Sequence, residues 1–559
     1  MTTVVYSTSQ LENTTKVKPK LATPFATLVL AAAICFSITN LVGVWSAYEA
    51  SGTLLHFGLF SVGVSVMFGI GWRSCHHPKT TLSLVGLGCS LLAAVIGVAY
   101  LLSFTTNSGM VASSLIVLLP LGAMSIIWNQ RQRQQTAVQL GLTAMGIAGV
   151  AFVLCFERTA WISLVAGLLG AAYVHWRFGA KRNIPSSLYQ LSDVIVVLGI
   201  GLGLFVYWQL LTNPHLDGWF KATPLGGALW KRVPLWRESL ALIQDYYFTG
   251  SGLGETAMVY STYVYLLHVP FLYHAHNLYL QIAVEQGMPG LIAFLWLALP
   301  LLGSLIVTYQ RTGPYSRLFC LATITALVAA LFYGLLDSEL YATLALPILF
   351  VPFGYALALH WSLLHRKPTK SWTEFENSAD HAWGLHQLGI AVLPVVSMVV
   401  VCLHPGFSTT WQVNLGTVAQ TKAELGEYDW PRWPIQDELR RSSRINLSEA
   451  MHDYKAVLAE DPNNITAHAR LGQIALSRGD YTAATQHLEI AYRFAPQRNA
   501  VRQLLGEVYA ATGQIEEAAA LWHTVDTGAG QLDDRLWWYT HLNAQREVNW
   551  IQQAIALAH

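Results

Sequence analysis

Residues 271–290 read FLYHAHNLYLQIAVEQGMPG, a polar, histidine-rich stretch between long apolar runs. His274 and His276 alternate, and Asn277 follows them directly. Apolar side chains then recur at helical spacing as far as Glu285, so a helix is expected to begin near Asn277, a residue type that caps helix N-termini. The Gly-Met-Pro-Gly that ends the stretch predicts a turn before the next apolar run.

The composition around this stretch is typical of a membrane protein. Only 12% of the 559 residues are charged, and the mean hydropathy is +0.39, whereas soluble domains carry about 25% charged residues. The net charge of +1 gives no electrostatic basis for binding nucleic acid, and none is expected as a partner. The six cysteines show neither metal-ligand nor disulfide spacing, and they are expected to be small packing residues.

Membrane-spanning helices need about 20 mostly apolar residues. Eleven stretches satisfy this requirement: 24–45, 54–72, 81–103, 109–128, 137–156, 160–176, 191–211, 288–308, 318–336, 342–364 and 386–403. The run after residues 1–20 is too long for a cleaved signal peptide, so residues 1–20 are expected to be a cytoplasmic tail. The chain is therefore expected to be all-α, with a polytopic membrane domain over residues 21–403.

The basic residues indicate the orientation of this domain. Threading the spans alternately places fifteen basic residues on one side: Lys16, Lys18, Lys20, Arg73, Lys79, Arg131, Arg133, Arg177, Lys181, Arg182, Arg311, Arg317, Arg366, Lys367 and Lys370. The short loops on the other side hold only Arg158. Lys and Arg accumulate in cytoplasmic loops, so the N-terminus is expected to be cytoplasmic. The large loop 212–287, hereafter the outer loop, and everything after residue 404 are then expected on the outer face.

The last part of the chain carries an internal repeat with an offset of 34 residues. Leu471-Gly472 recurs as Leu505-Gly506, and Tyr481, Ala484, Leu488 and Pro462 each have a counterpart 34 residues later. This period resembles the tetratricopeptide repeat, which stacks helix pairs into a concave surface. Residues 446–559 are therefore expected to form a soluble, extracytoplasmic repeat domain closed by a helix with Trp537, Trp538 and Trp550. Residues 404–445 are expected to be an irregular docked linker, with a sugar or peptide contact at its Trp-Pro motif as the alternative.

Arg158 is expected where a span meets the outer face. An arginine at membrane depth is costly unless it is paired or functional. Arg158 could pair with Glu157 or extend its charge to the interface. It could equally grip a phosphate with two parallel hydrogen bonds.

Other candidate residues lie upstream of the histidines in the outer loop. Arg232 and Trp236 share one face of an expected helix, and Arg237 falls on the neighbouring face. The segment GSGLGE at 250–255 has no strand before it and no Lys-Ser/Thr after it, so it is neither a dinucleotide fingerprint nor a phosphate-binding loop. A conformational role is expected for its glycines.

The two histidines are suited to proton transfer. The positive end of a helix dipole disfavours a protonated imidazole, so a histidine at a helix N-terminus can act as a general base. A metal site is the alternative, since His274 and His276 could combine with Glu285. No further Cys, His or Asp lies at ligand spacing, so no metal is expected.

The motif Arg-x-x-x-Trp at 232–236, the following GSGLGE, and HNLYLQIAVEQGMPG at 276–290 resemble the signature of the O-antigen ligase and O-antigen polymerase superfamily, which includes the bacterial protein O-oligosaccharyltransferases. The resemblance extends over residues 20–403 but is specific only at 232–290. It implies transfer of a glycan from undecaprenyl diphosphate to an acceptor hydroxyl at the outer face of the membrane, without metal, nucleotide sugar or another cofactor.

The resemblance also implies roles for particular residues. His276, which Asn277 follows directly, would deprotonate the acceptor, with His274 as the alternative base. Arg232 would hold the donor diphosphate, and the remaining candidates would assist, namely Arg158 and Arg237 at the diphosphate, and Trp236, Asn277, Glu285 and Asp337 as supporting residues.

The acceptor can be a lipid, a growing polysaccharide or a protein, and a protein could bind in the repeat groove. Two other functions remain open at this point. A flippase is one alternative, although the polar motif lies in a loop rather than at the bilayer midplane. A membrane-tethered scaffold is the other, although it leaves the Arg and His residues without a role.

Overall fold

A computed structural model describes residues 24–179, 186–213, 232–364, 406–428, 435–525 and 530–559, with Val396, Val399 and Leu403 as isolated positions. Every regular element in these ranges is a helix. The expected tail 1–20, the expected span 386–403 and the Trp-Pro motif of the linker lie outside the described residues, in whole or in part.

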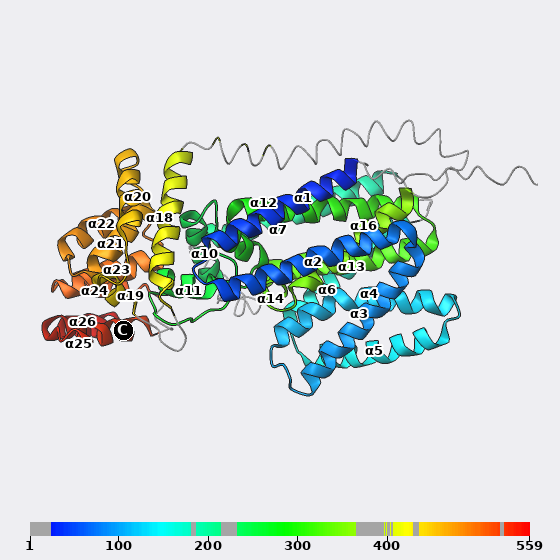
Figure 1. The fold of residues 1–559 in the computed structure, drawn as a ribbon, viewed down its shortest axis with the longest axis horizontal. Coiled ribbons are helices and arrows are strands. Elements are labelled where there is room, and N and C mark those ends of the chain that lie inside the picture. The colour runs from blue at the N-terminus through cyan, green and yellow to red at the C-terminus, as the bar shows by residue number, and fades with distance from the viewer. Residues whose placement is uncertain are drawn as a thin grey trace, which may run out of the picture.

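Within the described ranges, nine helices are long and apolar enough to cross a membrane. They correspond to nine of the expected spans: α1 (Pro24–Ser46), α2 (Ala50–His76), α3 (Pro78–Leu101), α4 (Ser108–Arg131), α5 (Gln135–Leu154), α6 (Arg158–Phe178), α7 (Ser186–Thr212), α12 (Leu278–Arg311) and α13 (Pro314–Leu336). The long helices run roughly alongside one another (Figure 1). The fold is therefore a polytopic helix bundle, as expected.

One expected span is broken. Residues 342–364 do not form a single helix, because α14 (Glu339–Ala342), α15 (Leu346–Leu349) and α16 (Val351–Leu364) follow one another with short interruptions. Proline fits the first turn of a helix but disfavours helical conformation in the residue before it. Pro347 and Pro352 each lie at the start of a new segment, which explains the breaks. The expected turn at 287–290 is, by contrast, a kink inside α12.

Close helix contacts in the bundle occur at small residues. A Cβ on Gly167 of α6 would lie 2.3 Å from the carbonyl oxygen of Thr325 in α13, so only glycine permits this approach. The helix α7 differs from the other long helices, because only 6% of the residues in its most apolar stretch are buried. Long apolar side chains exposed along a whole helix are expected to face lipid.

The outer loop and the C-terminal helices lie at the same end of the bundle (Figure 1). The described part of the loop contains α10 (Val233–Asp245), α11 (Thr256–Tyr260) and the π-helix η2 (Ser261–Tyr265). This arrangement agrees with the expectation that both parts share one side of the membrane; the identity of that side stays a prediction.

The C-terminal region is a stack of helix pairs: α18 (Phe407–Leu425), α19 (Gln436–Arg441), α20 (Ser448–Glu460), α21 (Ile465–Ser477), α22 (Tyr481–Phe494), α23 (Asn499–Ala511), α24 (Ile515–Trp522), α25 (Gln531–His541) and α26 (Gln545–Ala558). The helix α23 begins 34 residues after α21. A Cβ on Gly472 would meet Leu488, and one on Gly506 would meet Trp522, so the same close approach occurs in both pairs. The period therefore reflects a repeated packing contact.

The expectation of an irregular linker over 404–445 is wrong for its described part. The helix α18 packs beside α20, so the two form a further helix pair that precedes α21 and α22. Its internal residues include Val413, which joins the same apolar cluster as Tyr454 of α20. At the other end of the stack, Trp538 is buried within the closing pair α25 and α26, whereas Trp537 is exposed.

Candidate active site

The helix α12 is broken at Gly287, where φ is +70°. A helical carbonyl normally accepts from the N–H four residues later. The carbonyl of Glu285 has no such donor, because Pro289 lacks an N–H. The N–H of Met288, which would serve Val284, donates to a loop carbonyl instead. The break therefore leaves two carbonyls available to the outer loop.

The Gly-rich segment 250–255 supplies donors to these two carbonyls. The N–H of Ser251 lies 2.8 Å from the carbonyl oxygen of Val284, and that of Gly252 lies 3.3 Å from that of Glu285. Gly250 has φ +69°, and a Cβ there would lie 2.2 Å from the backbone of Glu285. The conformational role expected for these glycines is thereby confirmed, because a side chain would prevent the loop from closing on α12.

Asn277 is the N-cap of α12, as expected. Its side-chain oxygen accepts from the N–H groups of Tyr279 and Leu280, each at 2.9 Å. Its amide nitrogen donates to the carbonyl of Leu335 at 3.1 Å, near the end of α13. Asn277 therefore caps one helix and ties it to the next, which places the residues before α12 against the residues after α13.

The backbone of Ala275, between the two histidines, forms hydrogen bonds through both its carbonyl and its N–H. The indole N–H of Trp236 donates to the carbonyl of Ala275 at 3.1 Å. The side-chain oxygen of Gln281 accepts from the N–H of Ala275 at 2.7 Å, and its amide nitrogen donates to Glu285 at 2.6 Å. Trp236 and Glu285, two of the expected supporting residues, thus fix the backbone that carries the histidines.

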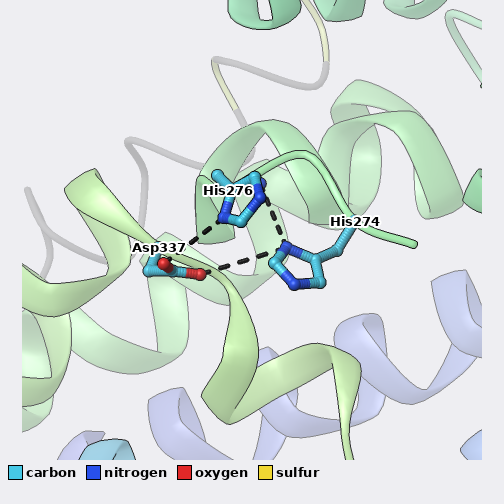
Figure 2. A group of neighbouring side chains, drawn as sticks. All are labelled: His274, His276 and Asp337. Atoms are coloured by element: carbon cyan, nitrogen blue, oxygen red, sulfur yellow. Dashed lines mark hydrogen bonds and ion pairs between the residues drawn. The ribbon is translucent and has the colours of Figure 1, made fainter. Parts of the chain in front are cut away.

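Asp337, the residue after α13, lies against both histidines (Figure 2). One carboxylate oxygen is 3.3 Å from Nδ1 of His276, and the other is 3.9 Å from Nδ1 of His274. The guanidinium of Arg232 lies 3.0 Å from the oxygen that faces His276, and it also donates to the carbonyl of Leu336. Asp337, His274, His276 and Arg232 are called the Asp337 cluster below.

The two histidines differ in what their ring nitrogens can do. The backbone N–H of His276 donates to Nδ1 of His274 at 3.3 Å, so Nδ1 of His274 is the unprotonated ring nitrogen. Nε2 of His274 then carries the proton and donates to Glu339 at 3.1 Å. Both nitrogens of His274 are therefore engaged, and its side chain is only 11% exposed.

His276 keeps one nitrogen accessible. Its Nδ1 faces Asp337, its side chain is 30% exposed, and no hydrogen bond joins Nε2 to another residue that the structure describes. His276 also has φ +48°, a left-handed conformation that is uncommon for residues other than glycine. This geometry favours His276 over His274 as a base, because only its Nε2 can take up a proton from outside.

The two carboxyl groups that contact the histidines are ionised more readily than usual. Burial opposes the charge of Asp337, but the hydrogen bond from His276 and the charges of His276 and Arg232 outweigh burial and lower its pKa. Burial likewise opposes the charge of Glu339, and its hydrogen bond with His274 leads to a lowered pKa. Neither carboxyl group is therefore suited to donate a proton near neutral pH.

Two other expected phosphate-binding residues lie outside the Asp337 cluster. Arg158 begins α6 and is exposed, and no hydrogen bond or ion pair joins its side chain to another described residue. Its neighbour Glu157 accepts from Ser108, and Asn107 donates to Glu339, so this end of α6 lies on the same side of the bundle as the cluster.

Arg237 donates to carbonyls at the end of α7, at 2.8 Å for Leu210 and 3.3 Å for both Leu211 and Asn213. Carbonyls at a helix C-terminus lack partners within the helix. This placement favours a structural role for Arg237 as a C-terminal cap of α7.

Three polar residues of the site were not identified from the sequence. Ser338 and Glu339 contact His274, and Gln281 holds the peptide of Ala275. Gln281 had a detectable signal, because it precedes Glu285 by four residues on the same helix face. Glu339 had none, since only the packing of α12 against α13 brings it to the histidines.

The ligand atoms of His274, His276 and Asp337 lie within 4.8 Å of one another, so their spacing could suit a metal ion. Two features weigh against this use. The guanidinium of Arg232 already lies 3.0 Å from Asp337 and would repel a metal cation. The Nδ1 of His274, the atom nearest to Asp337, already accepts from a backbone N–H. The absence of a metal stays a prediction.

Residues 143–295 match the protein-family model for O-antigen ligases. The match runs from α5 into α12 and includes Arg158, Arg232 and both histidines, whereas Asp337 lies beyond it. No curated protein matches the chain. The match supports the O-antigen ligase superfamily and glycan transfer of the O-antigen ligase type in a membrane. Together with the apolar helices, it fits a multi-pass membrane protein.

Proposed function

We propose that the protein transfers a glycan from a polyprenyl-diphosphate-linked donor, of the undecaprenyl type, to an acceptor hydroxyl on the outer face of the membrane. The observation that carries this proposal is the carboxylate of Asp337. One of its oxygens lies close both to a histidine with an accessible nitrogen and to an arginine that is 24% exposed. A base and a cation are therefore held side by side, as this reaction needs.

His276 takes the role of general base. The acceptor hydroxyl attacks C1 of the first donor sugar, and its proton passes to Nε2 of His276 as the new C1–O bond forms. Asp337 holds the other ring nitrogen, fixes the tautomer and stabilises the imidazolium that results. The lowered pKa of Asp337 supports this role, because the carboxylate stays charged when the proton arrives.

Arg232 stabilises the leaving group. The bond between C1 and the diphosphate oxygen breaks as the hydroxyl attacks, and negative charge develops on the diphosphate. The guanidinium can exchange its contact with Asp337 for a bidentate contact with phosphate oxygens. Arg158, at the same end of the bundle, is proposed as a second, outer contact for the diphosphate. One displacement of this kind inverts the anomeric centre.

Hydrolysis is disfavoured by the same geometry. Glycoside hydrolysis uses a protonated carboxylic acid together with a second carboxylate. The two carboxyl groups that contact the histidines, those of Asp337 and Glu339, have lowered pKa values. The acceptor can be a lipid-linked sugar, a growing polysaccharide or a protein hydroxyl, and its identity determines whether the enzyme is a ligase, a polymerase or an oligosaccharyltransferase.

The test is a reconstituted assay with purified protein, an undecaprenyl-diphosphate-linked glycan and candidate acceptors. Loss of the lipid-linked species and gain of a glycosylated acceptor are followed together. His276→Ala and Arg232→Ala should each lower the rate by about 10²- to 10⁴-fold, the usual range for a lost general base or a lost charge at the transition state. EDTA should leave the rate unchanged.

Wild-type rates in both variants would refute the proposal. Movement of the donor across the bilayer without cleavage would point to a flippase, and loss of donor without a glycosylated acceptor would point to a hydrolase. Inhibition by EDTA that is reversed by added zinc would instead assign the Asp337 cluster to a metal.

A further inference from the structure

Two parts of the outer loop lead to the proposed catalytic groups, and both also contact the C-terminal helices. The helix α10 begins directly after Arg232 and ends at Asp245. The segment 261–268 precedes His274 by a few residues and includes η2. The outer loop and the C-terminal helices lie next to each other at one end of the bundle (Figure 1).

The first contact is made by the carboxylate of Asp245, which is buried at the end of α10. One oxygen accepts from the hydroxyl of Thr466 at 2.6 Å and from Arg498 at 3.0 Å. The other lies 3.4 Å from a guanidinium nitrogen of Arg470. These partners belong to α21 and to the turn before α23, and both arginine side chains are at most 10% exposed.

The second contact is made by the segment 261–268. Leu266, which has φ +56°, is buried in one apolar cluster with Leu476, Leu504 and Leu505 of α21 and α23. The ring of Tyr263 lies 3.6 Å from the guanidinium of Arg470, at a distance suited to a cation–π interaction.

At the end of the same segment, Nδ1 of His268 lies 3.1 Å from the carboxylate of Asp534. The faces of α21 and α23 that contact these residues are therefore covered by the chain's own loop. A protein partner, one of the alternatives that the repeat groove allows, could bind these faces only by displacing this loop.

We infer that the C-terminal helical domain positions Arg232 relative to His276, with Asp245 and Leu266 as the anchoring residues. This inference rests on the proposed function. When a diphosphate takes the place of Asp337 beside Arg232, the ion pair between Arg232 and the bundle is lost, so the position of α10 depends more on its remaining contacts, including those at its other end. Asp245 provides that fixation through two buried arginines.

The physical consequence is large because catalysis depends on short distances. A displacement of about 1 Å at a positioning contact can lower a rate by about 10²-fold. Removal of the charge of Asp245 leaves Arg470 and Arg498 buried without their shared anion, and burial of an uncompensated charge is unfavourable. The end of α10 is then expected to separate from the C-terminal helices and to release Arg232 from its position.

The experiment uses the full chain with Asp245→Asn. The kcat/KM for the lipid-linked donor should fall about tenfold or more, because Arg232 both contacts the donor and stabilises its leaving group. Amide hydrogen exchange should increase in α10 and stay unchanged at the start of α12. Glu427→Gln is the matched control, because Glu427 forms an exposed ion pair with Arg444 in the same region; this variant should alter neither quantity.

Arg498→Lys is the milder second variant, in case Asp245→Asn does not fold, and it should give a smaller change in the same direction. Unchanged kcat/KM for the donor and unchanged exchange in α10 would overturn the inference, as would faster exchange in α10 without any change in kcat/KM. A wild-type chain that transfers no glycan would refute the proposed function instead. Exchange would still show in that case whether Asp245 holds α10.

Discussion

Asp337 and Asp437 are both buried aspartates that face cations, but their surroundings differ in one respect. The partners of Asp337, Arg232 and His276, have side chains that are 24% and 30% exposed. The partners of Asp437 in the C-terminal domain, Arg440 and Arg535, are 3% and 5% exposed. Burial opposes the charge of each carboxyl group, and the cations beside it lower its pKa nonetheless.

The difference separates the proposed active site from a structural ion cluster. Around Asp437, Arg535 lies at 2.7 Å and the hydroxyl of Ser477 at 2.6 Å, so the carboxylate has few bonds left to offer. Around Asp337, one imidazole nitrogen and part of a guanidinium remain accessible. The same pairing of charges therefore holds helices together in one region and leaves groups for a substrate in the other.

The largest effect expected is on catalysis at Asp337. Asp337→Asn should lower the rate of glycan transfer by about 10²- to 10⁴-fold, because an amide cannot stabilise the imidazolium of His276. The melting temperature should change little, since water can reach Arg232 when its partner is lost. Initial rates and thermal unfolding of the same preparation check both. A rate within twofold of wild type would remove the distinction between the two aspartates.

Asp437→Asn should have the opposite profile. It leaves Arg440 and Arg535 buried without their shared charge, which should lower the free energy of unfolding by about 3 kcal/mol. Thermal unfolding followed by tryptophan fluorescence measures this loss. Transfer by the folded fraction at low temperature should match wild type. A loss of transfer at unchanged stability would show that this ion cluster also acts on the active site.

Glu255 is a buried carboxyl group with no arginine among its described partners, and its replacement is expected to change stability only at higher pH. Its hydrogen-bond partners include the hydroxyl of Thr53 at 2.8 Å, the N–H of Glu49 at 3.3 Å and the side chain of Tyr48. Burial outweighs these bonds and raises its pKa from 4.5 to about 7. The folded protein therefore binds a proton that the unfolded chain has released between these two values.

The sign of the pH dependence follows from this shift. The contribution of Glu255 to stability is complete below its ordinary pKa and is lost as the pH rises through about 7. Glu255→Gln should therefore be more stable than wild type by about 3 kcal/mol at pH 8 and equally stable near pH 4. Unfolding midpoints between pH 4 and pH 8 check this prediction. A difference that does not vary with pH would contradict it.

The membrane helices and the repeat could be predicted from the sequence because both depend on local patterns. A span requires a run of apolar residues of sufficient length, and nine such runs are helices in the described part of the chain. The N-cap at Asn277 was predictable for the same reason, since its hydrogen bonds join residues two and three positions away. The broken span at 342–364 was missed because its hydropathy is continuous across Pro347 and Pro352.

The candidate site was only partly predictable. His276 and Arg232 were chosen from a motif, and Asp337 was included without any indication of which histidine it would contact. The hydrogen bonds of Arg237 to the end of α7 join residues 24 to 27 positions apart in the sequence. The contact of Glu339 with His274 joins residues 65 positions apart. Such contacts leave no pattern in a single sequence.

The sequence by itself determined which segments are apolar, where α12 begins, the 34-residue period and the set of polar residues available for chemistry. These properties follow from side-chain hydrophobicity and from bonds between near neighbours. The tertiary structure alone decided that Asp337 joins His276 to Arg232, that His274 is occupied by Glu339, and that the outer loop covers α21 and α23. These features depend on the way separate helices pack, because only packing brings side chains distant in the chain within hydrogen-bonding range.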